Sequence, residues 1–111
     1  MSSGDSGFET KVQGVLDRIA AALEEAGADD LDLDLTDGVL TIEDEGGRVW
    51  VVNRHVPLKQ IWLSSPVSGA GHYSWAPAAG HWAATRGGPP LEEVLSAELG
   101  ALVGRPVAFT G

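Results

Sequence analysis

The side chains most capable of chemistry in this sequence are carboxylates, and they crowd the first part of the chain. Residues 1–45 hold thirteen of the sixteen Asp and Glu residues and two of the seven Lys and Arg residues, so this part carries −11 and the remainder +2. Carboxylate oxygens are the ligands that hard cations such as magnesium, calcium, manganese and iron ions prefer. The clustering therefore predicts a surface that meets something cationic, either metal ions or a basic patch of another protein.

The placement of these acids makes the prediction more specific. One set lies at the end of the first predicted helix and along the strand after it: Glu24, Glu25, Asp29, Asp30, Asp32 and Asp34. The C-terminus of a helix already carries about half a negative charge, so each acid there costs roughly 0.3–1 kcal/mol. Alternate residues of a strand point to one face, about 6.6 Å apart. These acids either form a carboxylate ridge for cations or are a solvated surface that only keeps the protein soluble.

An EF-hand calcium loop is excluded, although part of its spacing is present. Asp32, Asp34 and Thr36 match the first ligand positions, and Glu43 stands at position twelve. The loop requires glycine at position six for its sharp turn, and Asp37 stands there. An open ridge of carboxylates, without histidine or thiolate, is expected to bind cations weakly and with little selectivity.

The sequence offers no other catalytic or metal-binding pattern. It has no cysteine, which excludes disulfides and thiolate zinc sites. Its histidines, His55, His72 and His81, show no i, i+4 spacing, and Ser64-Ser65 has no visible acid–base partner, so we expect no dedicated enzyme. The net charge of −9 disfavours nucleic acid and anionic lipid as partners. No apolar run reaches the ~20 residues of a membrane span, and no targeting segment is evident at the start.

Hydropathy periods predict a helix, six strands and a second helix. Apolar residues recur at helical spacing from Phe8 to Leu23, which predicts a helix near 8–26, with Gly27 suited to its end. The strands are expected at 31–35, 39–42, 48–53, 59–65, 72–75 and 81–85, with a loop over 68–71. A last helix has its apolar stripe from Leu91 to Leu102 and is ended by Gly104 and Pro106.

The short links between strands favour an antiparallel sheet. Two amphipathic helices then cover one face of the sheet and leave the other exposed to water. The expected fold is therefore α+β, a two-layer sandwich of about six antiparallel strands with the N- and C-terminal helices on one face. We expect a flexible tail at 1–7 and a single domain over 8–111.

The other informative stretch is 53–66. Because successive side chains of a strand point to opposite faces of the sheet, Ile61 and Leu63 lie on one face and Gln60 and Trp62 on the other. If the aliphatic pair faces the helices, Trp62 stands on the open face of the sheet. There it either packs on side chains of neighbouring strands or serves as a protein-binding hot spot. The tryptophans expected in the core are Trp50, Trp75 and Trp82.

Several motifs follow one another along the chain: Asp37-Gly38-Val39-Leu40-Thr41-Ile42, Asn53 with Pro57, Lys59-Gln60-Ile61-Trp62-Leu63-Ser64-Ser65-Pro66, Ser68-Gly69 with Tyr73 and Trp75, Trp82, and Leu91 through Leu99. Together they resemble the frataxin family from Phe8 to about Phe109, and the run from Gln60 to Pro66 is the most specific. The resemblance implies the frataxin fold and a role in iron–sulfur cluster assembly. It also implies weak iron binding and contact with a cysteine desulfurase and its scaffold protein.

The resemblance also implies which residues act. Iron, as Fe²⁺ or Fe³⁺, is expected at acids on the first helix and first strand: Glu24, Glu25, Asp29, Asp30, Asp32, Asp34 and Asp17. The partner-binding residues are expected on the sheet face: Asn53, Gln60, Trp62, Lys59 and His72. The chain departs from the family pattern at His72, where eukaryotic members place arginine, and at Leu58, where asparagine is common. Glu9 lies near the place where some bacterial members carry histidine.

Taken as a member of this family, the protein is expected to be an iron donor for cluster assembly, a regulator of the desulfurase–scaffold complex, or both. Two alternatives stay open. One is ferroxidase or iron-storage activity by iron clustered on the ridge, and the other is an adaptor that uses no metal. The short N-terminus and the absence of a targeting helix favour a bacterial, cytoplasmic protein. We also expect the protein to be a monomer when free of metal.

Overall fold

In this computed structural model, residues 3–26 and 31–104 are described, with side chains from residue 7 onward. The predictions that involve Gly27, Asp29, Asp30 and Pro106 lie outside the described residues. The elements, in chain order, are α1 (Ser3–Glu25), β1 (Asp32–Thr36), β2 (Val39–Glu43), β3 (Val49–His55), β4 (Gln60–Ser65), β5 (Gly69–Ala76), β6 (His81–Ala84) and α2 (Leu91–Val103).

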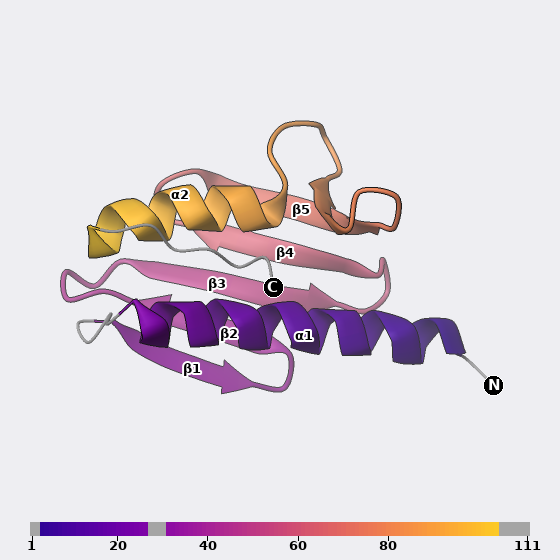
Figure 1. The fold of residues 1–111 in the computed structure, drawn as a ribbon, viewed down its shortest axis with the longest axis horizontal. Coiled ribbons are helices and arrows are strands. Elements are labelled where there is room, and N and C mark those ends of the chain that lie inside the picture. Colours follow the sequence, from indigo (N-terminus) through magenta and orange to yellow (C-terminus); the bar gives the residue numbers. More distant parts are fainter. Residues whose placement is uncertain (1–2, 27–30, 105–111) are drawn as a thin grey trace.

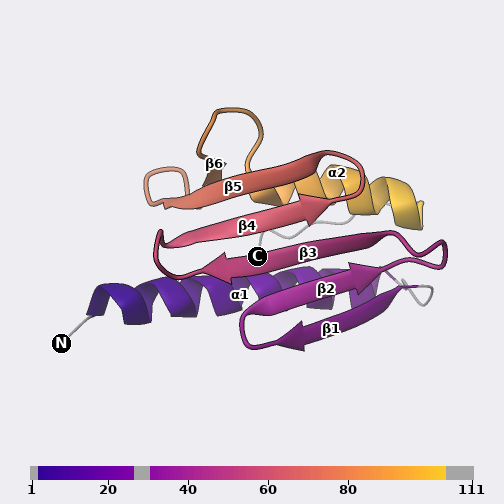
Figure 2. The ribbon, with the colours of Figure 1, turned by 180° about the vertical axis from the view of Figure 1, so that it is seen from behind.

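The six strands form one antiparallel sheet in the order β1-β2-β3-β4-β5-β6. Both helices lie on the same face of this sheet (Figure 1), and the view from behind shows the other face without a helix (Figure 2). The predicted two-layer α+β sandwich is therefore confirmed. In the described part of the chain, neither helix is long and apolar enough to span a bilayer.

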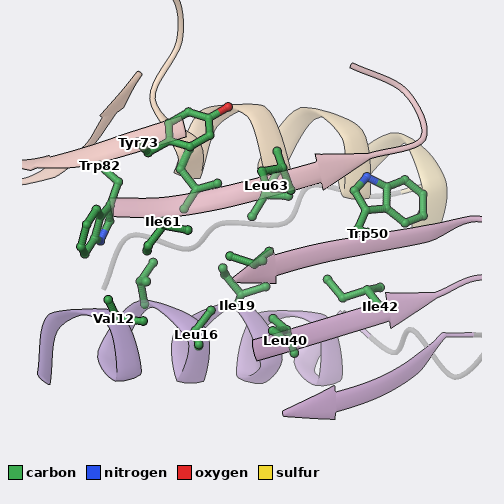
Figure 3. Close-up of a cluster of buried hydrophobic side chains, with 14 of the residues drawn as sticks. Val12, Leu16, Ile19, Leu40, Ile42, Trp50, Ile61, Leu63, Tyr73 and Trp82 are labelled. Carbon is green, nitrogen blue, oxygen red and sulfur yellow. The ribbon is translucent and has the colours of Figure 1, made fainter. Parts of the chain in front are cut away.

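The core lies between the helices and the sheet, where the apolar stripe of α1 meets alternate strand residues (Figure 3). Trp50 and Trp82 are fully buried, as predicted, and each large side chain buried in this way contributes roughly 1.5–3 kcal/mol. Trp75 is only half-buried, because it lies beside the edge strand β6 and meets Trp82 edge-on at 5.5 Å.

Two boundaries differ from the sequence prediction by three residues or more. Helix α1 begins at Ser3 instead of near residue 8, so residues 3–7 belong to the helix and not to the predicted tail. The apolar stripe begins only at Phe8, and a helix can continue beyond the stripe that packs it. Strand β5 begins at Gly69, inside the predicted loop, and Gly69 pairs with Ser65. Its left-handed φ of 84° suits the short turn that joins β4 to β5.

Two glutamates of α2 attach this helix to the sheet. The Glu98 carboxylate accepts hydrogen bonds from Trp50 Nε1 at 3.0 Å and Ser65 Oγ at 2.6 Å. The carboxylate of the buried Glu92 accepts the backbone N–H of Trp82, at 3.1 and 3.2 Å from its two oxygens. This contact satisfies a donor on the edge strand β6. At the other end of α2, Gly104 adopts a left-handed conformation with φ of 75°, as its predicted position after the helix requires.

Candidate functional site

The predicted iron ligands that the structure describes are all exposed. Asp17, Glu24 and Glu25 project from α1, while Asp32 and Asp34 project from β1. Asp17 lies two helical turns before Glu24, about 10 Å along the helix axis, and accepts a hydrogen bond from Gln13 Nε2 at 2.9 Å. It is therefore separated along the helix from the acids at the end of α1.

The strand register adds an acid that the sequence prediction did not include. The turn at Asp37 and Gly38 pairs Thr36 with Val39, and the same register places Asp32 directly opposite Glu43. Directly opposed residues have Cβ atoms about 4.5–5.5 Å apart, and like charges in such a pair destabilise the sheet. A two-residue hairpin fixes this register, so Glu43 could have been found by counting outward from the turn.

We call Glu24, Glu25, Asp32, Asp34 and Glu43 the acidic edge. Their carboxylates suit hard cations chemically, and a cation between Asp32 and Glu43 relieves their repulsion. Among residues 3–26 and 31–104, however, no three potential metal ligands come together in one group. Weak, unselective binding of cations at the acidic edge stays a prediction.

The predicted partner-binding residues gather on the open face of the sheet. The register places Asn53, Trp62 and His72 side by side on β3, β4 and β5, and Gln60 opposite His55. Lys59 lies in the turn before β4, with an unusual left-handed φ of 52°.

The indole of Trp62 is held on both faces. Its centroid lies 3.8 Å from the His55 ring and 4.2 Å from the His72 ring, with interplanar angles of 7° and 14°. Its Nε1–H donates to Gln60 Oε1 at 2.8 Å. We call His55, Trp62, His72 and Gln60 the Trp62 clamp. A partner can reach the edge of the indole and the two imidazoles, but neither ring face.

Sequence reasoning missed His55 because the diagonal contact across β3 and β4 depends on register and rotamer. The packing interpretation of Trp62 is confirmed, and its use as a protein-binding hot spot stays a prediction. Its faces pack on neighbouring strands, and its edge stays available on a half-buried residue.

Comparison with known proteins decides the family. The sequence profile described as Frataxin-like domain matches residues 1–105. The "Iron-sulfur cluster assembly protein CyaY" of Vibrio cholerae is 33% identical over 100 residues, which cover 90% of this chain and 92% of that protein. The chain belongs to the frataxin family.

Other frataxins agree with this membership. The mitochondrial frataxin homolog of Schizosaccharomyces pombe is 39% identical, over 78% of this chain but only 55% of that protein, so the chain spans about half of this longer relative. The solved frataxin of Psychromonas ingrahamii superimposes with a TM-score of 0.83 at 32% identity, covering 96% of this chain and 98% of that one. Trimeric yeast frataxin, solved in complex with ferrous iron, gives 0.72 at 32% identity, over 85% of this chain and 86% of that one.

Of the three positions that depart from the frataxin pattern, Glu9 and His72 make side-chain contacts here. Glu9 accepts a hydrogen bond from Arg54 Nη1 at 3.0 Å and so ties α1 to β3. Leu58 is 58% exposed at the tip of the β3–β4 turn, and its backbone N–H lies 3.4 Å from His55 Nδ1. His72 completes the Trp62 clamp.

Two groups near the site have shifted pKa values. Hydrogen bonds from the Arg48 side chain and backbone lower the pKa of Asp44 in the turn after β2. Burial, reinforced by the charge of Glu98, raises the pKa of Tyr73 on β5.

Proposed function

We propose that this frataxin serves iron–sulfur cluster assembly without being an enzyme. In this proposal the acidic edge carries iron loosely, and the Trp62 clamp docks on a cysteine desulfurase–scaffold complex and changes the rate of sulfur transfer. The name of the Vibrio cholerae relative supports the assembly role, and the ferrous complex of yeast frataxin supports iron as the cation.

One observation carries the proposal: part of the acidic edge and the Trp62 clamp share one face of the sheet. Trp62 pairs with Asn53, Asn53 with Val39, and Val39 with Thr36. Asp32, Asp34 and Thr36 are every second residue of β1, so their side chains point to the same face of the sheet. The four strands from β1 to β4 span about 14 Å, so one partner surface can contact both features at once.

The mechanism follows from this shared face. Bound iron neutralises part of the acidic edge, which changes how strongly that edge attracts basic side chains of the partner. The clamp supplies a rigid contact that loses little conformational entropy on docking. Iron loading and docking are therefore coupled through charge.

The test is the rate of cluster assembly at fixed iron, measured with and without this protein. Trp62→Ala should remove the effect of the protein, and Asp32→Asn with Glu43→Gln should reduce its dependence on iron. Asp37→Asn with Glu45→Gln is the matched control, because it also removes two acids, neither of which belongs to the acidic edge, and asparagine tolerates the left-handed φ of 50° at position 37. No effect of the wild-type protein on the assembly rate refutes the proposal.

The same preparation separates this role from ferroxidase activity. An iron carrier should consume oxygen for at most one equivalent of iron per site. Oxygen uptake that continues past that point makes the protein an enzyme and overturns this part of the proposal. An effect on the assembly rate that persists unchanged in the presence of an iron chelator favours an adaptor that uses no metal.

A further inference from the structure

A cavity of about 670 Å³ opens between β5, the segment 85–89 and α2. This volume lies within the range of about 300–1,000 Å³ that is typical of small-molecule sites. The cavity shares His72 with the Trp62 clamp and no residue with the acidic edge. It is therefore a concave feature separate from the acidic edge, and the proposed function does not use it.

Small residues leave this space open. Ala70 and Gly71 on β5 and Ala97 on α2 are among the residues that line the cavity. A Cβ at Gly71 would lie 2.7 Å from the Tyr73 hydroxyl oxygen, so glycine is what lets the phenol lie along β5. Gly87, with a left-handed φ of 85°, lies in the segment that forms the outer wall.

Two polar groups at the cavity have unused hydrogen-bonding capacity. Tyr73 is 5% exposed, its hydroxyl points away from α1 (Figure 3), and it bonds to no other residue within the described part of the chain. Glu98 Oε1 accepts hydrogen bonds from Trp50 Nε1 and Ser65 Oγ. The other carboxylate oxygen, Oε2, has no hydrogen-bond partner within the described part of the chain. Tyr73 and Glu98 both line the cavity, and the charge of Glu98 adds to the effect of burial in raising the pKa of Tyr73. A ligand that donates hydrogen bonds can satisfy both.

The charges of the lining favour a cation. Glu93 and Glu98 bring two carboxylates, and Arg86 brings one guanidinium, in a protein of net charge −9. Ala84, Val94 and Ala97 provide apolar walls between these groups. Apolar walls with a few convergent polar groups are typical of sites that orient an amphipathic ligand.

We propose that this cavity binds an alkylammonium or guanidinium group on an apolar stem. The cationic head donates to Glu98 Oε2 and to the Tyr73 oxygen, and the stem packs on Val94 and Ala97. Such a group is either a free small amine or a Lys or Arg side chain of a partner protein.

The test uses the full ¹⁵N-labelled chain, with n-butylammonium and n-butylguanidinium as probes. Both should cause saturable chemical-shift changes at Gly71 and Ala97. Uncharged n-butanol and the anion butyrate, which have stems of similar length, should cause no saturable change. Equal binding of butanol, or no saturable binding of either cation, overturns the proposal.

Variants locate the binding. Ala97→Leu fills the cavity from an exposed helix position that tolerates leucine, and it should weaken cation binding at least tenfold. Tyr73→Phe removes one acceptor and should weaken binding several-fold. Asp32→Asn controls for diffuse attraction to the acidic edge and should leave the affinity unchanged. Binding that survives Ala97→Leu lies elsewhere and refutes the assignment.

A second series distinguishes the two sources of the cation. N-acetyl-lysine amide and N-acetyl-arginine amide mimic partner side chains, and putrescine represents free amines. Tighter binding of the blocked amino acids supports a protein partner, whereas tighter binding of putrescine supports a free amine. Either result supports the proposed chemistry of the site.

Discussion

At the scale of single residues, the proposed docking depends most on the contacts of Trp62. A tryptophan on the open face of a sheet is ordinarily free to change rotamer, but here two imidazoles and the Gln60 side chain hold the ring. Parity along β4 predicts the face on which Trp62 lies. Parity could not predict the clamp, because the stacking depends on the register between three strands and on the rotamers of both histidines.

Replacing Trp62 with alanine should separate docking from folding. The change removes two stacked aromatic pairs, which are worth about 1–3 kcal/mol together, and leaves the opposite, helix-covered face untouched. We expect a lower melting temperature, an unchanged circular dichroism spectrum and no detectable binding to the desulfurase–scaffold complex. His55→Phe is the control, because it keeps a ring against the indole and should retain binding. Global unfolding of Trp62→Ala would instead make Trp62 part of the core.

Tyr73 should make the protein sensitive to alkaline pH. Burial and the charge of Glu98 raise its pKa in the folded state, so the unfolded chain loses this proton at a lower pH, near 10. The contribution of Tyr73 to stability is therefore complete below pH ~10 and is lost as the pH rises through the folded-state pKa. The melting temperature of the wild type should fall more steeply above pH 10 than that of Tyr73→Phe. Parallel curves for the two proteins would contradict this expectation.

At the scale of elements, the turn between β1 and β2 joins three parts of the fold. Gly38 has a left-handed φ of 75°, and a Cβ there would lie 2.8 Å from Arg54 Nε. The Arg54 backbone N–H donates to the Gly38 carbonyl at 3.0 Å, and its side chain reaches Glu9 on α1. Arg54 therefore links the β1–β2 hairpin, β3 and α1, and its side chain packs against Gly38.

Gly38→Ala should consequently destabilise the fold more than the backbone conformation alone explains. The left-handed conformation costs an L-residue about 1–2 kcal/mol, and displacement of the Arg54 side chain adds to that. Gly80→Ala isolates the backbone term, because Gly80 has a φ of 71° and open space around its Cβ position. Urea unfolding of both variants measures the difference. Equal losses would mean that the Arg54 side chain moves aside at no cost.

The elements themselves were largely predictable from the sequence, and their boundaries were less so. The change of period from 3.6 to 2 after the first helix separates helix from strands, and the short turns imply antiparallel pairing. The sequence predicts a loop at residues 69–71 because glycine is depleted in strands. In the structure these residues pair with β4. Tertiary pairing overrides propensity there, and no local pattern reveals it.

At the scale of the whole molecule, we expect the separation of charge to lower stability. The acidic edge opposes Asp32 and Glu43 across two strands and adds Glu24 and Glu25 at the negative end of the α1 dipole. The crowding of acids was predicted from the sequence, whereas the strand register was needed to find that Asp32 opposes Glu43.

Salt or divalent cations should therefore raise the melting temperature. Relief of about 1 kcal/mol of repulsion corresponds to roughly 4–8 °C in a domain of this size. Glu24→Gln with Asp32→Asn should remove much of that rise, while Asp37→Asn with Glu45→Gln, which also removes two acids, should preserve it. Calorimetry at several ionic strengths measures the effect. A melting temperature that is independent of both salt and metal would contradict the repulsion argument.

The two edge strands of the sheet are protected by different means, and the difference has a consequence for self-association. At β6 the Glu92 carboxylate accepts the hydrogen bond of the Trp82 backbone N–H, so this donor is not available to pair with another strand. At β1 the exposed charges of Asp32 and Asp34 repel a second copy of the chain. Ions can screen or neutralise this charge, whereas they leave the hydrogen bond at β6 in place. Edge-to-edge assembly of this protein is therefore expected to start at β1 and to increase with the cations that the acidic edge collects.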